Sequence, residues 1–272
     1  MNDDLISVIL PVWNPDITQL KECIDSIIEQ TYPNFEIILV YQKKPDCDEK
    51  FYDLMSKYND SRLKVMISKK GVCTARNVGI KNAAGKYIAI MDGDDICEKE
   101  RFEKQLKFMK DNGCNVVGSW AYSIANDGKI LAKIKYPIKH DEIRKKIMFH
   151  DVIINPSVIM EKQVLDDVGL YDVNLAGSED YDLWLRAMSK DYKFGNIPEF
   201  LLRLRENPDS VTRGNEWRKH RITSMKVRNR AFFLYGFRKP IDILYHIITP
   251  LSFFISPSLL FKIKKMMGWY EE

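Results

Sequence analysis

The first 113 residues alternate between short apolar runs and segments with helical periodicity, and this alternation restricts the fold more than any other feature. Apolar runs rich in β-branched residues predict strands buried on both faces at residues 5–12, 35–41, 62–67 and 86–91. Helical spacing of apolar residues predicts helices over 16–30, 48–58, 74–84 and 99–113, with Gly85 and Gly113 ending the last two. Strands that alternate with helices form an open, mostly parallel α/β sheet with helices on both faces.

An acidic cluster follows the fourth of these strands. In YIAIMDGDDICEKERF (87–102), the apolar run leads directly into Asp92, Asp94 and Asp95. Carboxylates this close repel one another and are costly to desolvate unless a positive group lies among them. One interpretation is a solvated acidic turn with a helix cap. The other is a divalent-cation site, which the position favours, because open α/β sheets bind ligands beyond the carboxyl ends of their strands.

Two further segments reach the same predicted edge, PVWNP after the first strand and YQKKPD after the second. Beyond residue 113 the pattern becomes mixed. Strands are predicted at 115–124, 130–138, 155–160 and 192–205, and helices at 140–149 and 178–190. We divide the chain into a main domain, residues 1–212, with halves 1–113 and 114–212, and a basic and apolar helical extension, residues 213–272.

Composition gives no positive sign of a nucleic-acid-binding, zinc-binding or exported protein. A net charge of +4 is too small to indicate nucleic-acid binding by itself. The five cysteines fit no zinc-binding spacing and predict reduced thiols, as in a cytoplasmic protein. The N-terminus is acidic where an export signal is basic, which again favours the cytoplasm.

The extension carries the most apolar segment of the chain, residues 241–261, between the basic stretch 213–230 and the lysines of KIKKMM. The segment has about the 20 residues that a spanning helix needs, but Asp242, Pro250 and Pro257 interrupt it. Two interpretations are open: a segment in the membrane interface with its basic residues toward anionic lipid, or short helices packed on the main domain. We expect the first.

Three stretches in this order resemble the family 2 glycosyltransferases with the GT-A fold, over about residues 5–205. VILPVWNP (8–15) resembles the first strand and its P-x-Y-N loop, with Trp13 in place of the usual Tyr. The segment 71–95 resembles the G-x-x-x-A-R-N-x-G helix that leads to a D-x-D motif, and SEDYDLWLRA (178–187) resembles the E-D-x-D-L-W-x-R segment that carries the catalytic base. Each motif alone is weak, whereas the three in this order are highly specific.

The resemblance implies a Rossmann-like GT-A domain that binds a UDP-sugar together with Mn²⁺ or Mg²⁺. The cation offsets the charge that develops on the diphosphate leaving group, and hard cations prefer carboxylate oxygens. Asp94 is the expected metal ligand, Asp92 is expected to reach the ribose or a metal-bound water, and Asp95 to support them. The full set expected at the donor is Pro11, Trp13, Tyr41, Arg76, Asn77, Asp92 and Asp94.

The resemblance also assigns a catalytic base. The family inverts the anomeric carbon in one displacement, so the acceptor hydroxyl must lose its proton to a nearby carboxylate. Asp180 is the candidate, and Glu179 could serve instead or orient its neighbour. Taken alone, without the D-x-D motif, EDYD is more typical of an acidic first helical turn.

One departure concerns the nucleoside. Where the family carries V-D-D-G-S-x-D after the second strand, this chain has VYQKKPDCD. Tyr41 could stack on the base and Gln42 could hydrogen-bond its edge. UDP is the expected nucleotide, and a different nucleotide or a loss of donor binding is left open. A sugar nucleotidyltransferase would need a glycine-rich, basic loop after the first strand, which PVWNPD does not supply.

The expected function is therefore a metal-dependent, inverting transfer of a hexose, β-linked galactose or glucose, from a UDP-sugar to a lipid-linked glycan acceptor. The pathway would be surface polysaccharide biosynthesis of the capsule or O-antigen type, at the inner face of the bacterial plasma membrane. No nucleic acid is expected as a partner, and a homo-oligomer is left open. The alternative is a non-catalytic binding or scaffold subunit, which the altered loop motivates.

Overall fold

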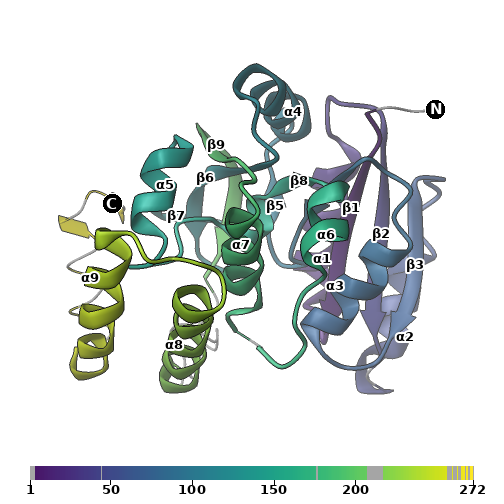
Figure 1. Ribbon diagram of the computed structural model, residues 1–272. Coiled ribbons are helices and arrows are strands. Elements are labelled where there is room, and N and C mark those ends of the chain that lie inside the picture. Colours follow the sequence, from purple (N-terminus) through teal and green to yellow (C-terminus); the bar gives the residue numbers. More distant parts are fainter. Residues whose placement is uncertain are drawn as a thin grey trace.

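The computed structural model describes residues 4–43, 45–175, 177–206, 217–255 and single residues between 259 and 271 (Figure 1). Four parallel strands form the N-terminal half of its sheet, in the order β4-β1-β2-β3. All four predicted strands are confirmed to within one residue at each end: β1 Ile6–Trp13, β2 Phe35–Gln42, β3 Leu63–Ser68 and β4 Tyr87–Ile90.

Helices cover both faces of this half of the sheet, because side chains along each strand alternate between the two faces. Val8 and Leu10 of β1 pack with the helices of one face, α1, α2 and α4, and Ile9 packs with α3 on the other. The helices run over α1 Ile17–Ile28, α2 Pro45–Met55, α3 Val72–Lys81 and α4 Arg101–Asn112.

The second half of the sheet is mixed. β8 (Ile159–Glu161) pairs antiparallel with β4 and with β6 (Val116–Ile124), and β9 (Phe194–Arg205) lies parallel to β6. The α/β class is confirmed, but only the N-terminal half of the sheet is parallel. The shorter strands are β5 Ile96–Cys97, β7 Ile130–Ile134 and β10 Tyr270–Glu271. The strand predicted at 155–160 is shorter, since Asn155–Ser157, with its proline, forms a 3₁₀ turn.

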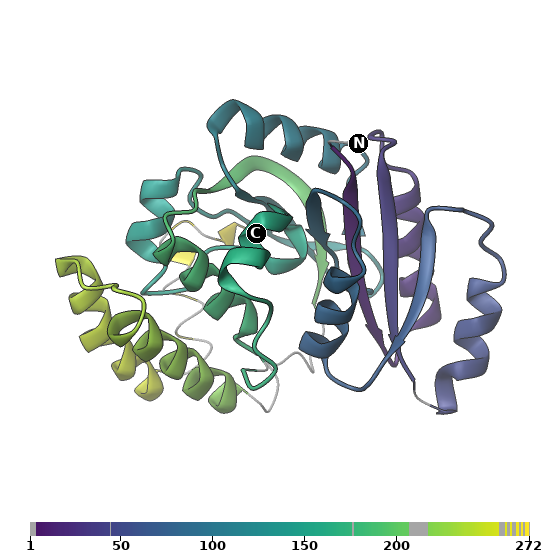
Figure 2. The same ribbon diagram turned by 45° about the vertical axis from the view of Figure 1, so that its right-hand side comes forward.

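Helices α5 (His140–Lys146), α6 (Lys162–Val168) and α7 (Glu179–Ser189) complete the main domain. In the extension, α8 (Trp217–Phe233) and α9 (Pro240–Ile248) lie side by side against the second half of the domain (Figure 2), followed by a 3₁₀ helix, Thr249–Phe254. The hydroxyls of Ser178 and Ser224 share a hydrogen bond of 2.8 Å between α7 and α8. Among the described residues, no helix is both long enough and apolar enough to cross a membrane.

The predicted helix ends hold for α4 and fail for α3. Gly113 adopts the left-handed conformation that ends α4 (φ 59°), whereas α3 ends at Lys81, with Asn82 and not Gly85 as its C-cap. Gly85 is needed for a different reason: a Cβ there would lie 2.6 Å from the carbonyl oxygen of Leu5. A glycine that permits close approach of two backbone segments cannot be distinguished by sequence from a helix stop.

Gly79 plays a similar role between α3 and the sheet, and we expect Gly79→Ala to destabilise the protein by about 1–3 kcal/mol. A Cβ at this position would lie 2.7 Å from Cγ2 of Ile9 and 3.3 Å from Cγ2 of Val40, so α3 would have to move away from β1 and β2. The free energy of unfolding from urea titration measures the effect. Lys81→Ala, on the exposed side of the same helix, is the matched control. Equal stabilities of the two variants would contradict this packing.

Candidate active site

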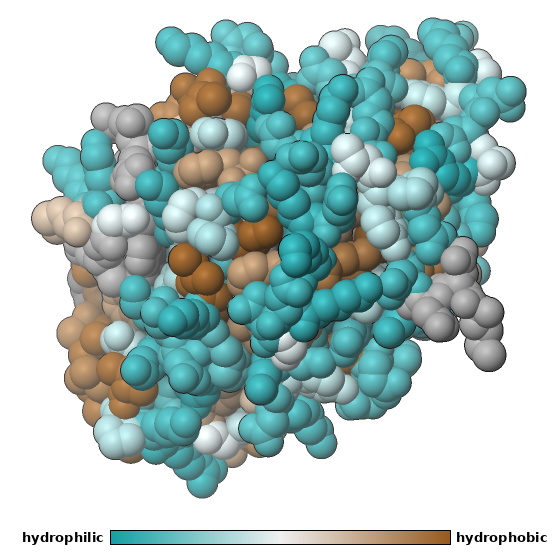
Figure 3. Space-filling model, turned by 90° about the horizontal axis from the view of Figure 1, so that it is seen from above, coloured by the Kyte–Doolittle hydropathy of each residue, from teal (hydrophilic) through white to brown (hydrophobic). Residues whose placement is uncertain are grey.

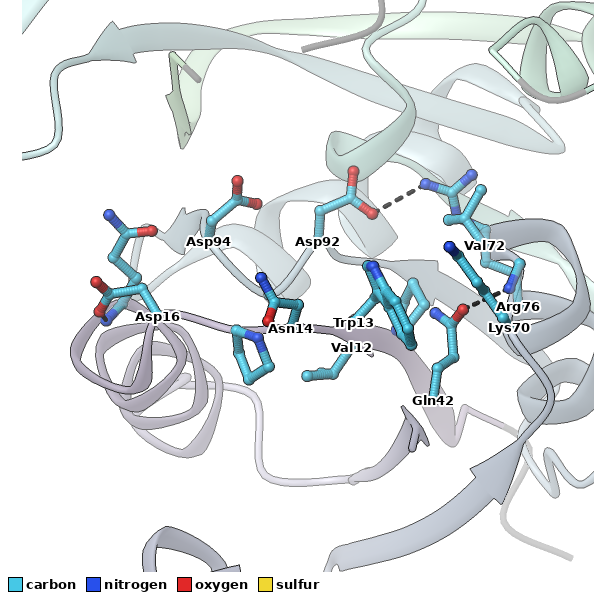
Figure 4. A pocket seen from close by; sticks show the side chains of 15 residues that line it. Val12, Trp13, Asn14, Asp16, Gln42, Lys70, Val72, Arg76, Asp92 and Asp94 are labelled. Carbon is cyan, nitrogen blue, oxygen red and sulfur yellow. Dashed lines mark hydrogen bonds and ion pairs between the residues drawn. The ribbon is translucent and has the colours of Figure 1, made fainter. Parts of the chain in front are cut away.

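A cavity of about 520 Å³ opens at the carboxyl ends of β1 and β4 (Figure 4). This is the point at which the strand order reverses, because the chain continues from β1 to β2 on one side and places β4 on the other. Open α/β sheets bind their ligands at such a point. The lining comes from the ends of β1 and β2, the loops after β1, β3 and β4, and the N-terminal turns of α1 and α3. It includes Pro11, Trp13, Asn14, Asp16, Gln19, Gln42, Lys70, Gly71, Arg76, Asp92 and Asp94.

A buried guanidinium joins two of the sequence motifs. Arg76, 5% exposed on α3, donates from Nη2 to Oδ1 of Asp92 (2.9 Å) and from Nη1 to Oε1 of Glu179 (2.8 Å). Burial acts to lower the pKa of Arg76, but the carboxylates of Asp92 and Glu179 outweigh it and raise that pKa above its usual value. The D-x-D loop and the start of α7 are therefore held together by one permanent positive charge.

The carboxylates of Asp92 and Asp94 both face the cavity (Figure 4). Burial, followed by the charge of Asp92, raises the pKa of Asp94. Within the described ranges no three acidic, His or Cys side chains gather as a complete metal cage. Mg²⁺ and similar ions are commonly held by one or two carboxylates together with substrate phosphates. Asp92 and Asp94 therefore fit a cation whose remaining ligands come from a bound diphosphate.

Asp95, expected to support the metal ligands, is turned away from the cavity. Its side chain is buried, and Oδ1 accepts a hydrogen bond from the backbone N–H of Arg205 (2.8 Å) at the end of β9. Arg205 in turn donates from Nε to the carbonyl oxygen of Asp94 (2.8 Å). These two contacts fix the conformation of the D-x-D loop, so the role of Asp95 in the site is structural.

Two of the residues expected at the donor lie outside the cavity. Tyr41 is fully buried and stacks on Phe51 of α2 at 3.8 Å between ring centroids, so it cannot stack on a base. Asn77 lies one residue beyond Arg76 on α3, where its amide binds the backbone of Tyr171 through both its oxygen and its nitrogen. Successive residues of a strand or helix point in different directions, and the motif positions alone do not show which of them faces the ligand.

The loop after β3 contributes residues that sequence reasoning missed. Lys70 places its Nζ 4.8 Å from the centre of the Trp13 ring, and the backbone N–H of Gly71 donates to Oε1 of Gln42 (2.6 Å). The signal was available, because SKKG follows the third parallel strand as PVWNP follows the first. The rule that ligands bind beyond the carboxyl ends of strands applies to β3 as it does to β1, β2 and β4.

The candidate base lies beyond Arg76, in the first turn of α7. Asp180 does not line the cavity; its Oδ1 accepts the N–H of Tyr181 (2.7 Å). Burial, with the adjacent charge of Glu179, raises the pKa of Asp180 to about 6. Both carboxylate oxygens of Glu179 accept hydrogen bonds, one from Arg76 and one from the N–H of Gly177 (2.6 Å). The raised pKa of Asp180 lies in the range of a group that exchanges protons near neutral pH.

Comparison with known proteins identifies the family. The family model for glycosyl transferase family 2 matches residues 7–168, which is more than half of the chain. The chain belongs to glycosyl transferase family 2. The GT-A fold implied by the motifs is confirmed by the solved structure of Staphylococcus aureus TarS 1–349 in complex with UDP-GlcNAc: 17% identity, TM-score 0.70, 95% of this chain and 75% of that chain covered.

Curated relatives of this glycosyltransferase come from several organisms. An uncharacterised glycosyltransferase of Methanocaldococcus jannaschii, MJ1057, is 35% identical over 211 residues, 75% of this chain and 72% of the relative. The O-antigen biosynthesis glycosyltransferase WbnJ of Escherichia coli is 33% identical over 74% of this chain and 80% of its own length. The Escherichia coli enzyme WfgD, named as a UDP-Glc:α-D-GlcNAc-diphosphoundecaprenol β-1,3-glucosyltransferase, is 32% identical over 69% of this chain and 71% of its own. Three Rickettsia relatives are longer, and the match spans 33% or less of their length.

The environment of Asp180 predicts how this glycosyltransferase responds to pH. The carboxyl ¹³C signal of Asp180 should titrate with a midpoint near pH 6, and Glu179→Gln should lower the midpoint, because it removes a neighbouring negative charge. Since the folded protein holds this proton more tightly than the unfolded chain, stability should fall as pH rises from about 4 to 6. Asp180→Asn should lose that part of the pH dependence. A wild-type midpoint close to that of a free aspartate would contradict the burial described above.

Proposed function

We propose that the protein is a metal-dependent, inverting hexosyltransferase that uses a UDP-sugar donor and a lipid-linked glycan acceptor in surface polysaccharide biosynthesis. The observation that carries the proposal is the joining of Asp92 to Glu179 through Arg76. It ties the carboxylates that face the cavity to the turn that carries the candidate base, which is the arrangement a sugar transfer needs.

The relatives support the polysaccharide part of the proposal. The name of WbnJ gives O-antigen biosynthesis, and that of WfgD gives a UDP-glucose donor, a β-1,3 linkage and a diphosphoundecaprenol acceptor. By analogy we assign this chain a β-linked glucose or galactose and a lipid-linked acceptor. Such an acceptor places the enzyme at the inner face of the bacterial plasma membrane, in peripheral contact through residues 213–272.

The donor diphosphate is assigned to the Asp92–Asp94 side of the cavity. Asp94, with Asp92, would hold Mn²⁺ or Mg²⁺, which when bound supplies positive charge for the departing diphosphate. Arg76 holds one oxygen of Asp92 and so orients its carboxylate toward the cavity. Asp95 and Arg205 keep the loop in place without contacting the donor.

The nucleobase is assigned to the side formed by Trp13, Gln42 and Lys70. Trp13, 39% exposed, offers an aromatic face for stacking. The N–H of Gly71 can only be accepted by the amide oxygen of Gln42, so the amide nitrogen of Gln42 is left on the side toward Trp13 (Figure 4). Its two hydrogens are donors for a carbonyl oxygen. Uracil presents such oxygens, and Gln42 thereby replaces the acidic residues that the family usually carries there.

The chemical step follows from the remaining residues. The acceptor oxygen attacks the anomeric carbon as the bond from that carbon to the diphosphate oxygen breaks, which inverts the configuration. Asp180 takes the proton that the acceptor hydroxyl loses. The raised pKa of Asp180, about 6, lies close to neutral pH, where a carboxylate is both ionised and basic enough to accept a proton. Glu179, bound to Arg76, positions the turn.

Release of nucleotide from a panel of sugar nucleotides, with Mn²⁺ and with chelator, tests this function. We expect Mn²⁺-dependent release of UDP from one donor when acceptor lipid is present. Asp94→Ala should abolish metal-dependent release, since the remaining ligand, Asp92, is shared with Arg76.

Asp180→Asn should abolish transfer yet leave metal-dependent UDP binding within about threefold of wild type, because Asp180 does not line the cavity. Lost UDP binding in Asp180→Asn would refute its role as base. Binding of UDP without turnover of any donor, with acceptor present, would favour the non-catalytic subunit.

Gln42→Glu tests the assignment of the base. The carboxylate keeps an oxygen for Gly71 and exchanges the amide donor for an acceptor, so the ratio of UDP to CDP affinity should fall by about tenfold, as expected for one mispaired polar contact. Isothermal titration with both nucleotides measures the ratio. Gln19→Glu, which adds the same charge elsewhere in the cavity lining, should leave the ratio unchanged. Equal behaviour of the two variants would remove Gln42 from base recognition.

A further inference from the structure

Helix α9 turns several large apolar side chains outward while it buries an acidic one. On its inward face Asp242 is fully buried. The guanidinium of Arg144 on α5 donates two hydrogen bonds to the Asp242 carboxylate (2.7 and 2.8 Å), a bidentate ion pair. The outward face of α9 presents Ile243, Leu244 and Ile247, of which Ile247 is 65% exposed. A surface helix of a globular protein normally turns such residues to the core.

The apolar surface continues beyond α9. Phe233 and Leu234, at the end of α8, are 61% and 73% exposed, and the ring of Phe233 lies 5.8 Å from that of His246 on α9. Leu251, in the following 3₁₀ helix, is 60% exposed. Figure 3 shows apolar surface gathered at its lower left, on the side where Figure 1 places α9. We call Phe233, Leu234, Ile243, Leu244, Ile247 and Leu251 the α8–α9 apolar face.

Positive charge predominates in the extension that carries this face. Residues 213–272 hold twelve lysines and arginines but four acidic residues, of which Asp242 is neutralised by Arg144 in the interior. The exposed bases among the described residues of the extension include Lys219, Lys226, Arg238, Lys239, Lys262 and Lys265. Two copies docked through this face would bring like charges together, whereas an anionic surface would meet complementary ones.

We infer that the α8–α9 apolar face docks on the anionic surface of a phospholipid bilayer. Apolar side chains enter the boundary between headgroups and acyl chains, and the flanking lysines and arginines contact anionic headgroups. The buried Arg144–Asp242 pair fixes α9 on the domain with its apolar side outward. The α8–α9 apolar face is therefore already formed in the protein without lipid. The inference deepens the proposed function, because a lipid-linked acceptor is reached at a membrane.

Co-sedimentation with vesicles tests the inference. Wild-type protein should bind vesicles made of equal parts of phosphatidylcholine and phosphatidylglycerol, and should bind less to pure phosphatidylcholine or at raised salt. Leu244→Gln/Ile247→Gln/Leu251→Gln should weaken binding to the mixed vesicles by about tenfold or more, because three apolar side chains no longer enter the lipid. The matched control is Val65→Gln/Ile67→Gln/Ile130→Gln, which changes exposed apolar residues elsewhere and should bind like wild type.

Folding and UDP binding are measured on both variants. UDP binding should be unchanged, which separates failure of the lipid surface from failure of the proposed donor site. Equal binding of wild type to neutral and anionic vesicles, or equal loss in the two triple variants, would overturn the inference. If the wild-type protein forms a concentration-dependent dimer, and only Leu244→Gln/Ile247→Gln/Leu251→Gln loses it, the face would instead bind a second copy of the chain.

Discussion

The structure depends most on one buried positive charge. Arg76 is desolvated, and its charge is balanced only because Asp92 and Glu179 converge on it from different parts of the chain. Removing one partner of a buried ion pair usually costs about 3–5 kcal/mol, since the other charge is left uncompensated. The contact therefore determines where α7 begins relative to β4, and with it the position of Asp180.

The strand order explains why these residues can meet. β4 lies beside β1 rather than beside β3, so the loops after β1 and β4 open away from each other and leave a cavity between them. Arg76 reaches it from α3, which packs on β1 through the space left by Gly79. Glu179 lies at the start of α7, 103 residues after Arg76 in the sequence. Local sequence patterns cannot relate residues at that separation.

Much of the fold was predictable because buried parallel strands leave a strong signal. Apolar runs identified β1 to β4 to within a residue, and the three motifs identified the family. What failed was side-chain direction: Tyr41 points into the core and Gln42, its neighbour, into the cavity. The prediction that Gly85 ends a helix failed for a related reason: this glycine allows the backbone of Leu5 to approach closely. Both outcomes depend on tertiary neighbours that periodicity does not describe.

The lining of the cavity divides into two sets of residues with different freedom to change. Arg76, Asp92 and Glu179 share one charge balance, so a change at one of them must be matched at another. Trp13 and Gln42 are neighbours at the ends of β1 and β2, and Lys70 follows in the loop after β3; these three form the second set in the cavity lining. Lys70 lies over the Trp13 ring and the neighbouring Gly71 binds Gln42, so these positions are expected to change together. Such changes can leave the charge balance of Arg76, Asp92 and Glu179 as it is, a separation of parts that suits both directed evolution and natural divergence.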